Sequence, residues 1–181
     1  MAQSIFDTPI GPLFADASAG GLRLLTFLQG ARHAGHVENL ASEQRPASEG
    51  EAIIEETRRQ IEAYFAGDLR RFDLPLDLKG TPFRRRVWQA IAVIPFGETA
   101  SYAEVAVEAG APGAYRAAGS ACGANPVVII VPCHRVVGSD RALHGFGGGL
   151  GTKVALLRHE GSLQSVKPAA IELAERQAAL I

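Results

Sequence analysis

The order of apolar and polar residues divides the chain into an N-terminal region of strands and a later region of helices. Between residues 4 and 28, apolar side chains recur at short intervals and are separated by Pro and Gly turns, which is typical of paired β-strands. Residues 29–50 are polar and predict a surface loop. From 51 to 66 the apolar positions follow a helical spacing that Gly67 ends. Residues 72–78 alternate again and predict a strand or an extended segment that leads out of this region.

Helix signals dominate the next part of the chain. Thr81 is a good N-cap for a helix with Pro82 at its first position, and this helix has an apolar face. Ser101 caps a second helix that stops at Gly110, and a third helix is expected over about 114–122. Two short helices around a Gly-bearing turn form a helix-turn-helix pattern, although an ordinary helical hairpin has the same signature.

Candidate chemistry follows an apolar run, residues 127–131, that predicts a buried strand. Cys133 comes at the end of this run with His134 beside it, and Glu160 lies downstream as an acid that could orient the histidine. Because the thiolate is the nucleophile, a reactive cysteine needs such a base or a positive field nearby. The alternatives are a Cys that is an inert small hydrophobe, a His that fills the core or binds a metal, and a Glu that is a solvated helix end. The other histidines supply no partners at metal-ligand spacing, so no metal site is expected.

This region resembles the O6-alkylguanine-DNA alkyltransferase family. The resemblance rests on Asn125-Pro126, the apolar run with the PCHRV sequence after it, the glycine-rich residues 145–150 and the LLRHEG sequence at 156–161. It extends upstream over 83–123 and more loosely to 8–13. It implies direct reversal of DNA damage: after base flipping, an alkyl group moves from O6 of guanine, and from O4 of thymine, to the cysteine. The thioether is stable, so each molecule acts once.

The family's catalytic residues match individual positions of this chain. The Cys that matches Cys133 takes the alkyl group, and the His that matches His134 acts on it through a bound water. The Glu that matches Glu160 orients that His, and the Asn that matches Asn125 holds the turn beside the Cys. The resemblance implies that no cofactor and no metal take part.

The resemblance also implies how DNA is bound. Arg116 matches an Arg that enters the base stack where the target nucleotide leaves, and Tyr102 matches a Tyr that contacts the 3′ phosphate. The partner is alkylated DNA, mainly duplex, which the protein approaches as a monomer through the minor groove. The expected DNA-binding residues are Arg116, Tyr102, Tyr115, Ala117 and Gly119, and the expected pocket residues are Phe146, Val136, Gly147 and Arg135.

Three features depart from the family pattern. Tyr115 stands where relatives usually have a small residue, and it can enlarge the wedge or crowd the groove. Cys122 stands where Asn or Met is frequent, and its thiol is open to oxidation or alkylation outside the main reaction. Residues 162–181 continue past the family's usual end, and their apolar spacing predicts a terminal helix of unknown role.

Together these patterns predict an α/β fold in two parts. Residues 1–78 are expected to form a small domain of sheet and helix, which the resemblance implies is ribonuclease-H-like. Residues 79–161 are expected to form a mostly helical domain with the helix-turn-helix and the active site, and 162–181 a tail. Charge differs between the parts: residues 1–78 hold 7 Lys and Arg against 12 Asp and Glu, and residues 79–181 hold 11 against 7. This asymmetry permits a phosphate-binding face on the half that carries the thiol.

The sequence also bears on the compartment of the protein and on rival functions. Two cysteines make no disulfide framework, and neither a signal peptide nor a membrane span is visible, so we expect a reduced cytoplasmic location without membrane contact. A cysteine hydrolase using Cys133, His134 and Glu160 would turn over through a thioester. An alkyltransferase-like binding protein would lack the cysteine, and a helix-turn-helix regulator would need an effector domain that the sequence does not show.

Overall fold

The chain forms two compact units, Met1–Lys79 and Gly80–Ile181. The structure is a computed structural model that describes residues 2–28 and 49–179. Most of the surface loop predicted for 29–50 lies outside the described residues. Within the described residues, no helix is long and apolar enough to cross a membrane.

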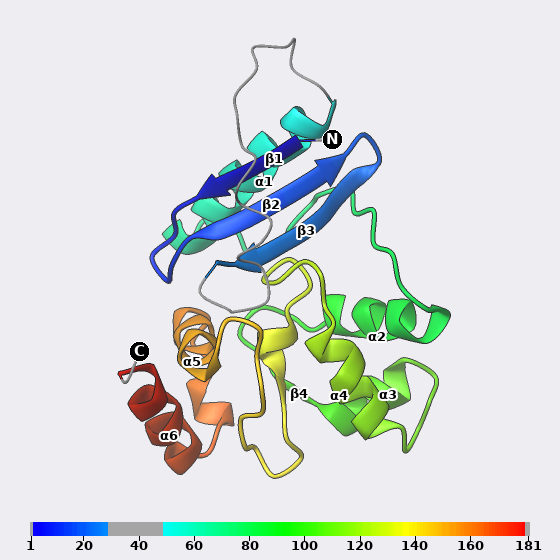
Figure 1. The fold of residues 1–181 in the computed structure, drawn as a ribbon. Coiled ribbons are helices and arrows are strands. Elements are labelled where there is room, and N and C mark those ends of the chain that lie inside the picture. Colours follow the sequence, from blue (N-terminus) through cyan, green and yellow to red (C-terminus); the bar gives the residue numbers. More distant parts are fainter. Residues whose placement is uncertain (1, 29–48, 180–181) are drawn as a thin grey trace. The chain divides into compact units, whose positions relative to one another are not determined.

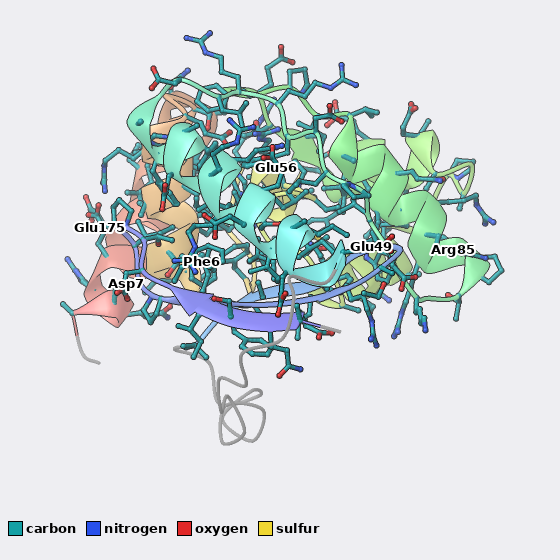
Figure 2. All side chains as sticks on the ribbon, turned by 90° about the horizontal axis from the view of Figure 1, so that it is seen from above. Phe6, Asp7, Glu49, Glu56, Arg85 and Glu175 are labelled. Atoms are coloured by element: carbon teal, nitrogen blue, oxygen red, sulfur yellow. The ribbon has the colours of Figure 1, made fainter. Side chains whose placement is uncertain are left out.

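A three-stranded antiparallel sheet and one helix build the N-terminal unit (Figure 1). The strands β1 (Ala2–Phe6), β2 (Leu13–Ser18) and β3 (Gly21–Phe27) follow one another in the sheet in chain order. Helix α1 (Glu49–Ala66) packs on all three strands, and Figure 2 shows it across the sheet with Glu49 at its first turn. The predicted strands and helix are confirmed. The apolar core between them includes Leu13, Phe14, Leu25, Ile61 and Tyr64, all fully buried or nearly so.

The segment that follows α1 returns along β3 in an extended conformation. Leu76 forms an isolated parallel bridge with Leu22, whose N–H donates to the Pro75 carbonyl at 2.8 Å. Gly21 makes this approach possible, because its φ is +147° and a Cβ on it would lie 2.6 Å from the Pro75 oxygen. The Gln60 side chain fixes the same segment through two hydrogen bonds to the Asp73 backbone, of 2.7 and 2.8 Å.

Helices α2 (Pro82–Ala92), α3 (Tyr102–Glu108) and α4 (Tyr115–Gly123) open the C-terminal unit. Their predicted starts are confirmed, since the Thr81 hydroxyl caps α2 and a capping box between Ser101 and Glu104 caps α3. Gly110, with φ of 69°, ends α3 before the turn to α4. The Trp88 indole donates to the Ala121 carbonyl at 2.8 Å and so joins α2 to α4.

The rest of this unit includes a short pair of parallel strands, β4 (Ala100–Ser101) and β5 (Val136–Val137). The chain runs through the 3₁₀ turn η1 (Cys133–Arg135) and β5 to α5 (Leu150–His159). A second 3₁₀ turn, η2 (Leu163–Ser165), leads to α6 (Pro168–Ala178), which packs on α5 (Figure 1). The predicted terminal helix is therefore present. Its contact with α5 belongs to a buried apolar cluster of Val137, Leu143, Val154, Leu157, Val166 and Ala174.

One predicted element is wrong. Residues 127–131 are buried apart from the half-buried Ile130, as their composition suggested, but they form a turn and not a strand. The turn closes on itself through hydrogen bonds from Val131 N–H to the Val127 carbonyl and from Ile130 N–H to that of Val128. Ile129 has a positive φ of 71°, which breaks an extended run. Backbone groups that a strand would offer to neighbours are thus satisfied locally, and Cys133 begins a 3₁₀ turn.

Candidate active site

The Cys133 sulfur is buried just after the turn and lies beside the Asn125 amide. Only 5% of the residue is exposed. The Asn125 amide donates to the Cys133 sulfur at 3.1 Å and to the Val131 carbonyl at 2.7 Å, and its oxygen accepts from the Val127 N–H at 3.1 Å. Asn125 therefore uses one side chain both to hold the turn and to contact the thiol.

These surroundings favour the charged form of the Cys133 sulfur. A hydrogen bond from Cys122 lowers the pKa of the Cys133 thiol, burial opposes this, and the Asn125 amide and the Lys153 charge lower it further. The net effect is a pKa below the ordinary thiol value. Since the thiolate is the reactive form, the structure gives Cys133 the character of a nucleophile.

His134, Arg135 and Glu160 form a buried hydrogen-bonded cluster beside the thiol. A Glu160 oxygen lies 2.8 Å from His134 Nε2, and Arg135 donates to the two carboxylate oxygens at 2.8 and 2.9 Å. Arg135 also donates to the Ile94 carbonyl at 2.6 Å, and the Gly97 N–H lies 3.4 Å from the carboxylate. Burial raises the pKa of Glu160, but the hydrogen bonds from His134 and Arg135 outweigh it and hold that pKa far below its usual range.

This cluster decides which nitrogen of His134 can accept a proton. Burial lowers the pKa of His134 in spite of Glu160, so the ring is neutral near pH 7. The ionised Glu160 accepts only, and therefore the proton of the neutral ring belongs on Nε2. The other nitrogen, Nδ1, is buried without a hydrogen-bond partner in the described part of the chain. Nδ1 is therefore the basic atom of the site, and its lone pair can accept a proton.

Lys153 is a member of this site that the sequence reasoning missed. Its side chain is completely buried, and Nζ donates to the Val136 carbonyl at 2.7 Å and to that of His144 at 3.3 Å. Burial lowers its pKa, while the charges on Cys122 and Cys133 act in the opposite direction. The residue type alone gives no signal for burial, but Lys153 stands three and four residues before the buried Leu156 and Leu157, on the same face of α5.

The residues predicted to contact DNA lie on α3 and α4. Arg116 and Ala117 are exposed, and the Arg116 guanidinium lies 5.8 Å from the centre of the Tyr115 ring, which is 49% exposed. Tyr102 is mostly buried against α4, where a Cβ on Gly119 would lie 3.7 Å from its ring. Burial, with the two cysteines, raises the pKa of Tyr102 well above its ordinary value.

The predicted pocket residues are spread over different environments. The Phe146 ring is half-buried with its centre 6.5 Å from that of His134, Val136 is fully buried, and Gly147 is exposed. Arg135 is held on Glu160 as described above. Among the described residues no group of His, Cys, Asp and Glu could hold a metal ion.

Comparison with known proteins gives matches over both units. The ribonuclease-like domain of 6-O-methylguanine DNA methyltransferase matches residues 1–78, and the DNA binding domain matches residues 82–162. The methylated-DNA–protein-cysteine methyltransferase of Methanosarcina barkeri is 44% identical over 162 residues, which cover 88% of this chain and 97% of the relative. That of Mycobacterium bovis is 47% identical over 156 residues, which cover 86% and 90%.

Solved structures agree with these relatives. A crystal structure of Mycobacterium tuberculosis OGT in complex with DNA superimposes with a TM-score of 0.74 at 41% identity, over 93% of this chain and 97% of that one. The O6-methylguanine methyltransferase of the same organism gives a TM-score of 0.71 at 42% identity, over 94% and 97%.

Proposed function

The chain belongs to the 6-O-methylguanine DNA methyltransferase family, and on that basis we propose that Cys133 accepts the alkyl group in direct reversal of DNA damage. The protein is a methylated-DNA–protein-cysteine methyltransferase in activity, and its partner is DNA. The observation that carries the assignment to Cys133 is the hydrogen bond from the Asn125 amide to its sulfur, next to a histidine whose buried Nδ1 has no hydrogen-bond partner in the described part of the chain.

The cluster around Cys133 supports a simple sequence of steps. Glu160 accepts the Nε2–H of His134 and so keeps Nδ1 as the basic nitrogen. Nδ1 takes the thiol proton, which in this family passes through a bound water. The sulfur then attacks the methyl carbon, the S–C bond forms, and the C–O6 bond breaks with its electrons left on guanine, which regains a proton. The product is a thioether, so no step regenerates the thiol.

Asn125 and Lys153 act on the same charge. The Asn125 amide donates to the sulfur, and the buried ammonium of Lys153 adds a positive field, so both stabilise the thiolate relative to the thiol. As the negative charge leaves sulfur during transfer, neither group needs to move. Phe146 is the proposed wall for the guanine, and the distance of 6.5 Å between its ring centre and that of His134 supports this.

Helices α3 and α4 are the proposed DNA-binding helix-turn-helix. Apart from Tyr115 and Arg116, the exposed residues of α4 are small, so it has little with which to read a major-groove code and suits a close approach to the minor groove. Arg116 would fill the gap left by a flipped nucleotide, with Tyr102 at the phosphate beside it. O4-alkylthymine is a second proposed lesion, and duplex DNA bound by a monomer is the proposed complex.

Intact mass spectrometry after incubation with O6-methylguanine duplex DNA tests the proposal. We expect each molecule to gain the mass of one methyl group, mapped to Cys133, and none with unmethylated duplex of the same sequence. Cys133→Ser should lose transfer and keep DNA binding, because Arg116 lies on a different element. Repeated turnover with unmodified protein would overturn the assignment and favour a cysteine hydrolase.

A further inference from the structure

The chain has a second thiol, Cys122, that the transfer reaction does not use. Cys122 is in the last turn of α4, with 6% of its surface exposed, and Cys133 follows after the buried turn. The Cys122 sulfur lies 3.9 Å from the carbonyl oxygen of Cys133. Asn125 contacts both residues, since its N–H donates to the Cys122 carbonyl at 3.1 Å and its side-chain amide to the Cys133 sulfur at 3.1 Å. The turn therefore brings the two cysteines together in the folded chain.

The two thiols differ in protonation. The hydrogen bond between them lowers the pKa of Cys133 and raises that of Cys122, and burial raises the latter further. Cys133 is thus the nucleophile, and Cys122 is a protonated thiol whose sulfur contacts the Cys133 backbone. A low-pKa cysteine beside a second, resolving cysteine is the arrangement in which oxidation ends in a reversible disulfide.

We propose that Cys122 and Cys133 form a peroxide-sensitive pair that closes to a disulfide. The Cys133 thiolate attacks one oxygen of hydrogen peroxide, which forms the S–O bond of a sulfenic acid and breaks the O–O bond with release of hydroxide. The Cys122 sulfur then attacks the Cys133 sulfur, and the S–O bond breaks. Hydroxide leaves with the Cys122 proton as water. Overall two thiols are oxidised and one peroxide is reduced to two waters.

Access to Cys133 follows from the proposed function, on which this inference rests. A sulfur that meets the alkyl group of a guanine can also meet hydrogen peroxide, which is smaller than that substrate. The disulfide would remove the nucleophile until a dithiol reductant restores it. It would also divert the sulfenic acid from further oxidation to sulfinic and sulfonic acids, which reductants do not reverse. A protein that acts once per molecule would in this way keep its thiol through an oxidative episode.

Peroxide treatment followed by mass spectrometry under non-reducing conditions tests the pair. The chain has only these two cysteines, so an intramolecular disulfide can join no others. We expect wild type to lose the mass of two hydrogen atoms, to give a peptide that links Cys122 to Cys133, and to lose methyl transfer. Dithiothreitol should then restore most of the transfer measured for the untreated sample.

Cys122→Ala and Cys122→Ser are the matched variants, each compared with its own untreated activity. Both should gain the mass of two or three oxygen atoms on Cys133 and should fail to recover with dithiothreitol. Four outcomes would each overturn the proposed disulfide pair. They are a gain of oxygen by wild type, equal recovery of transfer in wild type and variants, no reaction with peroxide, and a disulfide between two molecules. The mass readout is independent of DNA, so failure of untreated wild type to accept methyl would count against the proposed function instead.

Discussion

Replacing Glu160 by glutamine measures how much the buried charge cluster stabilises the C-terminal unit. The change keeps the size of the side chain and removes its charge. In the folded protein the carboxylate lies 2.8 Å from His134 Nε2 and accepts two hydrogen bonds from Arg135, of 2.8 and 2.9 Å. A glutamine offers one acceptor oxygen, and its NH₂ group would face donors. The Arg135 guanidinium, only 5% exposed, would be left without a counter-charge.

The expected loss in the free energy of unfolding is large for a single substitution such as Glu160→Gln. Removing one partner of a buried ion pair costs about 3–5 kcal/mol, because the other charge stays buried and uncompensated. The remaining glutamine oxygen can still accept one bond, so we expect about 3 kcal/mol for Glu160→Gln. Glu175→Gln on α6 is the matched control, since Glu175 pairs with Arg158 at the surface (labelled in Figure 2). An exposed pair of this kind is worth about 0–1 kcal/mol.

Urea unfolding followed by tryptophan fluorescence is the assay. Trp88 is the single tryptophan of the chain, is buried, and belongs to the same unit as Glu160. We expect the midpoint to fall much further for Glu160→Gln than for Glu175→Gln. Equal losses in the two variants would refute the argument that the buried cluster stabilises the unit.

The contribution of Glu160 to stability depends on pH with a definite sign. The folded-state pKa of Glu160 is lowered, so its contribution to stability is complete above the ordinary glutamate pKa and is lost as pH falls toward the folded value. The stability difference between wild type and Glu160→Gln should therefore be constant near neutrality and shrink in acid. A difference that grows in acid would contradict the lowered pKa.

Three further outcomes are expected. Arg116→Ala should slow repair of duplex DNA about tenfold, equivalent to ~1.4 kcal/mol, and leave the rate with free O6-benzylguanine nearly unchanged. The duplex repair rate of Arg116→Lys should lie between those of Arg116→Ala and wild type. Equal slowing of both substrates by Arg116→Ala would refute the wedge role. Iodoacetamide labelling of Cys133 should rise with pH through a midpoint below the ordinary thiol value, and Asn125→Ala should move this midpoint upward, since it removes a hydrogen bond to the thiolate. Gly67→Ala should lower the free energy of unfolding by about 1 kcal/mol, because Gly67 has a positive φ. Gly21→Ala should lower it distinctly more, because the new Cβ would also meet the Pro75 oxygen. Urea unfolding followed by circular dichroism checks this order, and equal losses would contradict the close approach.

Elements with a local cause were predictable from the sequence. The starts of α2 and α3 follow from Thr81 and Ser101, whose hydroxyls accept backbone N–H groups three residues later. Gly67 and Gly110 end their helices with positive φ values. In each case the decisive interaction lies within one helical turn, so a short window of sequence contains it.

Elements that depend on distant partners were not predictable in the same way. The run 127–131 has the composition of a strand, but Asn125 and the run's own backbone bonds hold it as a turn. The pairing of β4 with β5 involves two residues on each side, too few to leave a pattern. Arg135 and Glu160 are 25 residues apart, and nothing in their spacing reveals that the arginine neutralises the acid. The places of His134 and Glu160 beside and downstream of Cys133 suggested their roles, and the family resemblance favoured these roles over the alternatives; the roles stay predictions.

The packing of α6 on α5 has a consequence for how the chain can be shortened or compared with its relatives. The family match ends at residue 162, yet Val166 and Ala174 complete the apolar cluster with Val154 and Leu157. A fragment cut at the end of the match would present that face of α5 to water and invite aggregation. Gly151 makes room for the last turn of α6, because a Cβ there would lie 2.5 Å from that of Ala178. A larger residue at this position would force the last turn of α6 to shift away from α5.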